Sequence, residues 1–541
     1  MATVYGNIPS SGIIDIPNSI PSGMLYRIKQ ILGCNREQVK MTPISGQGSV
    51  RGGQKIIVNL PPNSLVDLST FEMIFDGVCD HGGNTDATNI NKCVEARFFP
   101  RNMQSLIDSI DIKINGSSKQ RIDQYGFIYN ILHDFNAGDD SIRKNKVGQN
   151  AEPSTKTWSY SGRIKRRNMY PIGIVDFPQT YGDQATYTIR QWLGLLGGNG
   201  STSIIHTGLL GDVSIEITLA GGGILCKSAK PALTTYTNTA SLAGGYMINL
   251  NDLSNTSQGA TAYTTAALVA AQGYNYTLSN ISFNITKYSM PQSFYDAMAS
   301  VLSSGGMYQI YFPTYSVFQG NPTTDKSSTT RFSLSTASLD MVIGTFQLPN
   351  RDTLDYPLVG GTDYTAYTIS PATAAIGEEG IATTYNQLVE NCYPLTLNTS
   401  KYFCRNGDYI KQARFLIGGT PLNYENMTEM YNGMLRAFNN SQIDMLGGLH
   451  KGLVSLNHFK SQYFAHILKL NAQSDNDVYT VSGVNCKENA IDITWEVQGG
   501  ETYNTPDTRI LPANGTFVPV LIAAYSSHID ISANRSIVQM P

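Results

Sequence analysis

Charged residues are scarce in this 541-residue sequence, at 15% of the chain, against about 25% in an average soluble domain. Long apolar runs are missing as well, because no stretch approaches the roughly 18 residues that a membrane-spanning helix needs. The opening residues, MATVYGNIPS, lack the basic segment and apolar stretch of a signal peptide. We therefore expect neither a membrane protein nor a secreted one.

Sequence motifs of common catalytic and metal sites are also absent. The seven cysteines include no C-x-x-C pair, the seven histidines form no H-E-x-x-H, and no serine lies in G-x-S-x-G. His133, Asp134, Asp139 and Asp140 could offer ligands to a cation, but an acidic loop after a helix is more often a solvated turn. We predict no catalytic residue, no bound metal and no cofactor.

Turn-forming and strand-forming residues are abundant where charged residues are few. The chain has 50 Gly, 23 Pro and 31 Tyr, with long Ser, Thr and Asn tracts, which is typical of β-strands joined by many turns. Its length exceeds the roughly 250–300 residues at which one hydrophobic core stops growing. The composition predicts an all-β protein of two large domains.

Two strand signals in the first part of the chain recur in the second. Alternating apolar residues run over 110–114 and 413–417, and a Gly-containing turn and a helical pattern follow each. A second pair, 213–219 and 491–497, alternates in the same way and ends at a Gly-Gly turn. These repeats predict one supersecondary arrangement used twice.

A third pair joins residues 332–334 to 529–531, in the same order along the chain. The spacing between the first and second signals is 25 residues longer in the first copy, and that between the second and third is 81 residues longer. We therefore expect a duplicated β-domain whose first copy carries a long inserted loop. Most of that loop would be the small, polar segment 229–275, outside the core.

Helical spacing of apolar residues predicts short helices beside the strands. One follows residues 110–116 and closes near Phe135, and another begins at Pro291 and ends at Gly305. A third lies between Pro21 and Gly33, within a segment of residues 1–45 that we expect to form an N-terminal arm. A terminal helix packed on its own domain is the alternative. The residues expected to contact an inner partner or neighbouring chains are Met24, Leu25, Arg27, Ile28, Lys29, Leu32, Arg36 and Lys40.

A single basic cluster stands out, consisting of Arg163, Lys165, Arg166 and Arg167. It could meet a polyanion, although a single cluster within residues 163–167 of a chain of net charge −3 is more often a surface loop that pairs with a neighbour's acids. Without a basic stripe, sequence-specific binding of nucleic acid is not expected.

Seven segments resemble the double jelly-roll major capsid proteins of tailless double-stranded DNA viruses, in the branch of the polinton-like viruses and virophages. They are SIDIKINGSSKQRIDQYGFIYNIL, GLLGDVSIEITLAGG, TTRFSLSTASLDMVIGTF, SKYFCRNGDYIKQARFLIGGTP, MYNGMLRAFN, HFKSQYF and SGVNCKENAIDITWEV. The resemblance implies two consecutive eight-stranded jelly rolls with short peripheral helices. It places the first roll at residues 46–348, with an outward tower at about 224–275, and the second roll at 349–541.

The resemblance further implies a structural capsid protein without enzymatic activity, located in the virion shell and assembled inside the host cell. Three copies would form a pseudo-hexameric capsomer, and capsomers would tile an icosahedral shell. The implied partners are the protein itself, neighbouring capsomers, minor capsid and penton proteins, and an internal membrane or the genome through the N-terminal arm. A carbohydrate-binding or glycan-degrading β-sandwich protein is the alternative, because it would share the Tyr-rich, loop-rich composition.

Overall fold

The computed structural model describes about half of the chain. In the first part these are residues 35–79, 97–100, 103–136, 185–197, 203–227, 275–323, 327–347 and 351. Beyond them the described residues are 401–403, 405, 407, 410–426, 433, 437, 459, 463–473, 480–481, 483–487, 491–499, 517–532 and 537–540. The predicted helix at 21–33, the basic cluster at 163–167 and most of the predicted tower lie outside these residues.

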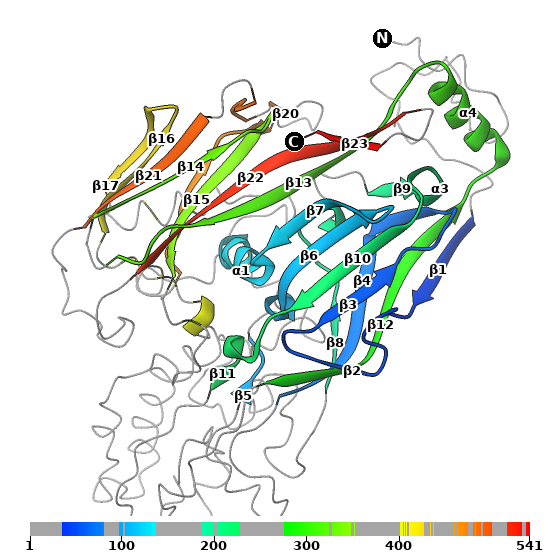
Figure 1. Cartoon of the computed structure of the whole chain (residues 1–541), viewed down its shortest axis with the longest axis horizontal. Coiled ribbons are helices and arrows are strands. Elements are labelled where there is room, and N and C mark those ends of the chain that lie inside the picture. Colours follow the sequence, from blue (N-terminus) through cyan, green and yellow to red (C-terminus); the bar gives the residue numbers. More distant parts are fainter. Residues whose placement is uncertain are drawn as a thin grey trace, which may run out of the picture.

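The first roll is built from two antiparallel sheets, in the orders β1-β12-β4-β8 and β3-β10-β6-β7 (Figure 1). Its eight main strands are β1 (Asn35–Met41), β3 (Lys55–Asn59), β4 (Leu65–Cys79), β6 (Ile107–Ile114), β7 (Ser117–Asp123), β8 (Ala185–Ile189), β10 (Val213–Leu219) and β12 (Tyr276–Ser289). Shorter elements complete it: β2 (Ser49–Arg51), β5 (Arg97–Phe98), β9 (Ile204–His206), β11 (Cys226–Lys227), α1 (Tyr125–Asn136) and α3 (Thr207–Leu210).

Alternation along the strands decides which side chains form the core. In β10 the apolar residues of VSIEITL are buried and the polar ones between them are half-exposed. The opposite strand β6 buries Ile110, Ile112 and Ile114 on the same face, because side chains of a strand point to alternate sides of the sheet. The strands predicted at 110–114 and 213–219 are confirmed as neighbours in one sheet.

The second roll repeats this topology strand for strand. Its sheets have the orders β13-β22-β15-β18 and β14-β21-β16-β17. The eight main strands are β13 (Tyr308–Gln319), β14 (Ser328–Leu334), β15 (Leu339–Gln347), β16 (Ile410–Ile417), β17 (Thr420–Asn426), β18 (His466–Lys469), β21 (Ile491–Gly499) and β22 (Val518–Ile531). Short strands are β19 (Ala472–Gln473), β20 (Thr480–Val481) and β23 (Ile537–Met540). Two eight-stranded jelly rolls are therefore confirmed.

The predicted boundary between the rolls, after residue 348, is wrong. β13 and β15 pair with β22, and β14 pairs with β21, so all three belong to the second roll. The first roll ends with β12, and α4 (Gln292–Ser303) connects it to β13. The alternation of apolar and polar residues in these strands is compatible with either roll, because it determines which face is buried but not which strand is the partner.

The third repeat pair is wrong for the same reason. Phe332 lies in β14 and Ile529 in β22, two strands of one roll, whereas the counterpart of β22 in the first roll is β12. The surplus of 81 residues therefore has no meaning as a loop length. Long connections occur in both rolls, since 348–409 separates β15 from β16 in the second.

The predicted limits of the arm and the tower also change. Residues 35–41 of the expected arm form β1, which pairs with β12 along its whole length. At the expected start of the tower, Ile224 and Leu225 are buried in the core and β11 pairs with β5. The rest of the predicted arm and tower, residues 1–34 and 228–274, lies outside the described residues.

Both helices predicted after residue 110 in the first part of the chain are confirmed. α1 buries Tyr125, Ile128 and Leu132. α4 begins after Pro291 and ends before Gly305, but Leu302 is its one buried residue and Val301 is 56% exposed. Figure 1 shows α4 projecting beyond the strands at one end of the molecule. Within the described part of the chain, no helix is long and apolar enough to cross a membrane.

Candidate functional site

The two rolls of the chain meet at a specific interface. β7 and the 3₁₀ turn Gly194–Gly197 of the first roll contact β13 of the second roll, and α1 contacts the second roll through Asp134 and Arg405. The buried Gln120 amide Nε2 in β7 donates to the backbone oxygen of Pro313 in β13 at 2.8 Å, and its Oε1 accepts from the backbone N–H of Leu195 at 2.8 Å. The amide nitrogen and the amide oxygen of Gln120 each have a hydrogen-bond partner, so the side chain can be buried without leaving either atom unpaired.

A glycine makes room for that side chain. Gly194 has φ +77°, and a Cβ at this position would lie 2.6 Å from Oε1 of Gln120. Any other residue would meet both backbone strain and a clash with the amide. The first roll thus positions Gln120 by a turn that only glycine fits well.

A buried ion pair joins the same two bodies. The guanidinium of Arg405, on the second roll, is 0% exposed and lies 2.6 Å from Oδ2 of Asp134, in the last turn of α1. Its Nε also donates to the backbone oxygen of Phe464 at 3.3 Å. Because removing one partner would leave a buried charge uncompensated, each residue depends on the other. Asp134 therefore serves the contact between the rolls and is not a free ligand for a cation.

The metal reading of that acidic loop finds no further support. Asp139 and Asp140 lie outside the described residues. Within the described ranges, no group of three or more His, Cys, Asp or Glu side chains is arranged to hold a metal ion.

Polar and aromatic contacts extend the interface beyond the ion pair. Gln124, before α1, accepts from Gln347 Nε2 at 3.1 Å and from Arg351 at 3.4 Å. The guanidinium of Arg351 also lies over the ring of Tyr402, 4.3 Å from its centroid, a favourable cation–π geometry. The same guanidinium lies 5.9 Å from the ring centroid of Phe127 in α1, so it also contacts the first roll.

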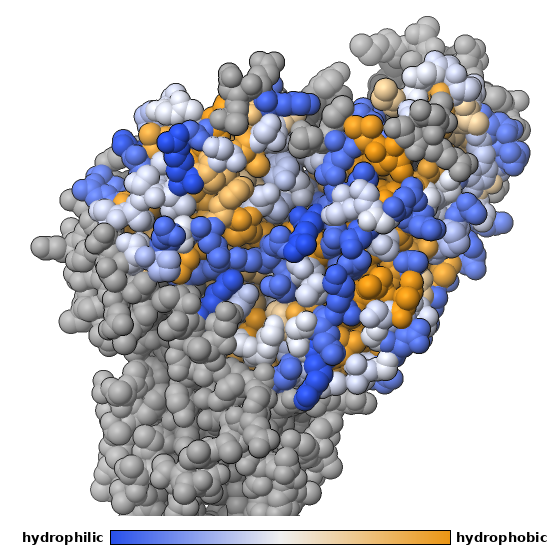
Figure 2. All heavy atoms as spheres, viewed as in Figure 1, coloured by the Kyte–Doolittle hydropathy of each residue, from blue (hydrophilic) through white to orange (hydrophobic). Residues whose placement is uncertain are grey.

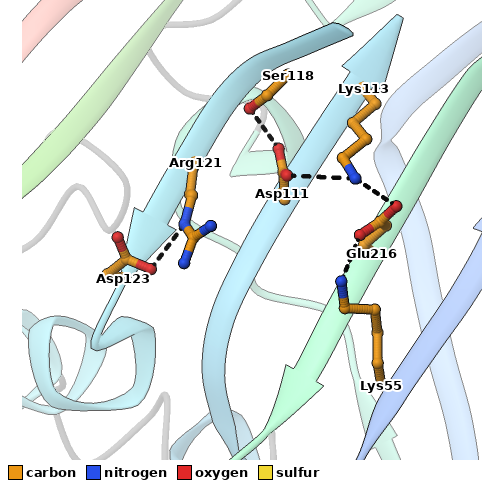
Figure 3. Close-up of polar contacts among 7 residues, drawn as sticks. All are labelled: Lys55, Asp111, Lys113, Ser118, Arg121, Asp123 and Glu216. Carbon is orange, nitrogen blue, oxygen red and sulfur yellow. Dashed lines mark hydrogen bonds and ion pairs between the residues drawn. The ribbon is translucent and has the colours of Figure 1, made fainter. Parts of the chain in front are cut away.

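The outward face of the first roll carries a ladder of alternating charges across its sheet (Figure 3). Glu216 in β10 accepts from Lys55 in β3 and from Lys113 in β6, both at 2.7 Å. Lys113 lies 3.8 Å from Asp111, which in turn accepts from Ser118 in β7 at 2.6 Å. The hydrogen bonds from Lys113 and Lys55 lower the pKa of Glu216, and the bond to Glu216 raises the pKa of Lys113.

The second roll carries a matching ladder on the matching sheet. Asp492 in β21 accepts from Arg331 and Ser333 in β14, and Glu496 in β21 accepts from Arg414 in β16 at 2.5 Å. In both rolls the charges are balanced within the face. Figure 2 shows hydrophilic residues as a band through the middle of the molecule, with hydrophobic residues on either side. Such balanced faces suit contact with a protein surface better than attraction of a polyanion.

The end of the molecule that bears α4 exposes apolar side chains. Val301 and Met307 are 56% and 59% exposed, and Ile204 in β9 is 37% exposed. The chain enters the first roll at the same end, because Asn35 lies opposite Ser289, close to the start of α4. β5 and β11 lie at the opposite end (Figure 1).

Few of the predicted contact residues fall in the described part of the chain. Arg36 and Lys40 lie exposed on β1, whereas the other arm residues and the cluster Arg163, Lys165, Arg166 and Arg167 lie outside it. Sequence reasoning missed Gln120 and Arg405. Neither has a local signal, because their partners are 193 and 271 residues away along the chain.

Comparisons with known proteins agree on the fold. No protein-family model and no curated protein sequence matches the chain. Among solved structures, the chain is similar to a quasi-atomic model of the PBCV-1 virus capsid, at 11% identity and a TM-score of 0.51, over 96% of this chain and 99% of that one. PBCV-1 VP54, fitted into a reconstruction of the virophage Sputnik, has 10% identity and a TM-score of 0.48, over 94% and 97% of the two chains. The faustovirus major capsid protein has 10% identity and a TM-score of 0.48, over 94% and 92%. The likeness to the PBCV-1 capsid confirms the double jelly-roll fold.

Proposed function

We propose that this protein is a structural capsid protein that associates with copies of itself into pseudo-hexameric trimers. The observation that carries the proposal is the presence of two complete rolls of identical strand order, held against one another by a specific interface. Three such chains supply six similar rolls, and a head-to-tail ring of three closes on itself. The shared fold with the PBCV-1 capsid chain supports this assignment.

We assign the two ends of the molecule to the two sides of a shell. The chain enters the first roll beside the apolar residues around α4, so residues 1–34 join β1 at the end of the molecule where we propose contact with an inner partner. Met24, Leu25, Ile28 and Leu32 would dock there, with Arg27 and Lys29 toward anionic lipid, genome or acidic neighbours. Minor capsid and penton proteins are the other partners proposed for the assembled shell.

The opposite end would face outward. The segment 228–274 lies between β11 and β12, and both strands reach the end of the roll away from α4 (Figure 1). A long, weakly charged segment leaving that end fits an external tower. We propose that the basic cluster at 163–167 meets acidic residues of a neighbouring capsomer. The protein would be located in the virion shell and assembled inside the host cell.

Mass photometry at nanomolar concentration tests the proposed function. Obligate interfaces typically bury about 2,000–5,000 Å², so a trimer should survive this dilution. The expected dominant species has three times the chain mass of 59.0 kDa. A stable single-chain mass would contradict the proposal, and saturable binding of glycans by that monomer would support the carbohydrate-binding alternative.

A further inference from the structure

We propose that His466 of β18 is an acid-sensitive lock, which holds the second roll closed at neutral pH and releases β18 and Arg405 when its imidazole takes up a proton. The proposal goes beyond the proposed function and does not depend on it, because it concerns the interior of one chain. Its basis is the buried contact of His466 with Trp495, together with the hydrogen bonds that join the start of β18 to Arg405.

The contact of His466 lies in the core of the second roll, between its two sheets. The residue is 1% exposed, and its ring stacks on Phe415 of β16 with the ring centroids 4.4 Å apart. Nε1 of Trp495 in β21 donates a hydrogen bond to Nδ1 of His466 at 3.1 Å. Because an indole N–H can only donate, Nδ1 carries no proton in this contact.

Protonation of His466 would break this hydrogen bond. The added proton has to go on Nδ1, which would then point a second donor at the N–H of Trp495. A positive charge would also have to be buried in the apolar core. The attraction between an imidazolium and the face of Phe415 is weaker than the cost of burying that charge. The folded roll therefore favours the neutral ring.

The charged groups around His466 do not compensate an added positive charge. The charged side chains that the structure describes on β18 and on the strands packed against it are Asp340, Arg414, Lys469, Asp492 and Glu496. The carboxylates among them are already engaged: Asp340 accepts from two serines, and those of β21 belong to the ladder on the outer face. Arg405, which donates to the backbone of Phe464, places another cation two residues before His466.

The residues that precede β18 hold Arg405 in place. The backbone oxygen of Phe464 accepts from Nε of Arg405 at 3.3 Å and from Oγ1 of Thr345 at 2.6 Å, and its N–H donates to the oxygen of Arg405 at 3.2 Å. Among the described strands, β18 is the terminal one of its sheet and has four residues, so it can open at a lower free energy than the whole roll. Opening would also loosen Arg405, whose guanidinium pairs with Asp134 of the first roll.

The corresponding strands of the first roll carry no such lock. β8 is the counterpart of β18 by strand order, and its residues, ATYTI, include no histidine. Ile217 of β10 corresponds to Trp495 in the sequence repeat and is fully buried. Acid should therefore open the second roll and leave the first roll closed.

Hydrogen exchange followed by mass spectrometry on the full-length protein tests the proposal. Exchange is compared at about pH 7.5 and about pH 5.5, on either side of the roughly 6.5 at which a water-exposed histidine is protonated, and is corrected for its intrinsic dependence on pH. Because the open state takes up the proton and the closed state does not, protection of β18 should fall about tenfold in acid. The last turn of α1, which pairs with Arg405, should lose protection with it, whereas β8 should not change.

Two histidine variants form a matched pair. His466→Asn keeps an oxygen that can accept from Trp495 but does not titrate in this range, so the acid response of β18 should disappear. His528 lies partly exposed on β22, 3.6 Å from Asp530, and His528→Asn should leave the acid response unchanged. Trp495→Phe removes the donor and is a second test of the same contact, in which the fall in protection should be smaller.

Several results would overturn the proposal. They are unchanged protection of β18 in acid in the unsubstituted protein, a full acid response in His466→Asn or Trp495→Phe, and an equal loss of protection in β8. A fall in β18 without a fall in α1 would overturn the link to Arg405. None of these results bears on the association of copies, which mass photometry measures separately.

Discussion

β1 and β13 are the corresponding edge strands of the two rolls, yet their surroundings differ. β13 lies against the first roll and gives a backbone oxygen to Gln120, whereas residues 35–38 of β1 are exposed. α1 adds to the contact within the chain, because Asp134 in its last turn pairs with Arg405 of the second roll. The two rolls thus share a strand order but differ at this edge, which the first roll covers in β13 and which is exposed in β1.

The largest expected effect comes from removing the open edge. Deleting residues 1–34 should leave the trimer intact and impair only shell assembly, because the arm ends before β1. Deleting residues 1–41 also removes β1 and should abolish the trimer. Mass photometry measures both, with circular dichroism to confirm that each variant remains folded. A stable trimer without β1 would show that this edge is not the contact between chains.

The next largest effect is expected at the ion pair between Asp134 and Arg405, which joins the two rolls of one chain. Asp134→Ala leaves the buried Arg405 guanidinium without its carboxylate and should cost about 3–5 kcal/mol of unfolding free energy. Urea unfolding measures this cost, and the loss of coupling should split the transition into two steps. The double variant Asp134→Leu with Arg405→Met should regain most of the stability, because an apolar pair of similar volume removes the uncompensated charge. A cost below about 1 kcal/mol for Asp134→Ala would mean that the ion pair does not hold the rolls together.

A smaller effect should follow at the turn that positions Gln120. Gly194→Ala meets both a left-handed backbone, at φ +77°, and the Gln120 amide, whereas Gly116→Ala, at φ +78°, meets open space. Backbone strain alone costs about 1–2 kcal/mol, and the clash should add about 1–3 kcal/mol. Thermal unfolding of both variants isolates the contribution of the clash. Equal destabilisation would show that Gln120 moves away without loss.

The charge ladders should contribute less to the free energy of unfolding than the Asp134–Arg405 ion pair or the turn at Gly194. Glu216→Gln removes two ion pairs near the surface and should cost about 0.5–1 kcal/mol. The pKa of Glu216 is held below its usual 4.5 by Lys113 and Lys55, so its contribution is present above pH 4.5 and is lost as the pH falls through the lowered pKa. Unfolding measured against pH should show the two proteins converging in acid. A difference that persists unchanged at low pH would contradict the assigned pKa shift.

The smallest effect is expected at the proposed tower. Replacing residues 229–272 by a short Gly/Ser linker should change neither the trimer nor the stability of the rolls appreciably, because shortening a loop outside the core has a small entropic effect. Size-exclusion chromatography and thermal unfolding check this. Loss of soluble trimer would place the segment in the core or in an interface.

Strand alternation was enough to predict part of this fold. It identified β6, β10, β16 and β21 and the relation between the two copies. It did not give the register: Ile215 lies opposite Ile112 in the first roll, whereas Ile493, aligned with Ile215 by sequence, lies opposite Ile417. A shift of two residues keeps every side chain on its face, so the pattern cannot detect it.

The sequence did not predict which strands pair with one another or which residues join the two rolls. β13, β14 and β15 precede residue 348 and have alternation that suits either roll, and only pairing with β21 and β22 assigns them. Asp134 looked like part of an acidic loop because Arg405 is 271 residues away. Contacts over such distances depend on how the rolls pack, which no local pattern encodes.

Cryo-electron microscopy of the purified, full-length protein tests the central claim most directly. The account predicts particles of three chains with six-lobed outlines, in which the second roll of each chain abuts the first roll of the next. Particles with two lobes from a single chain, or closed assemblies without six similar lobes, would contradict it.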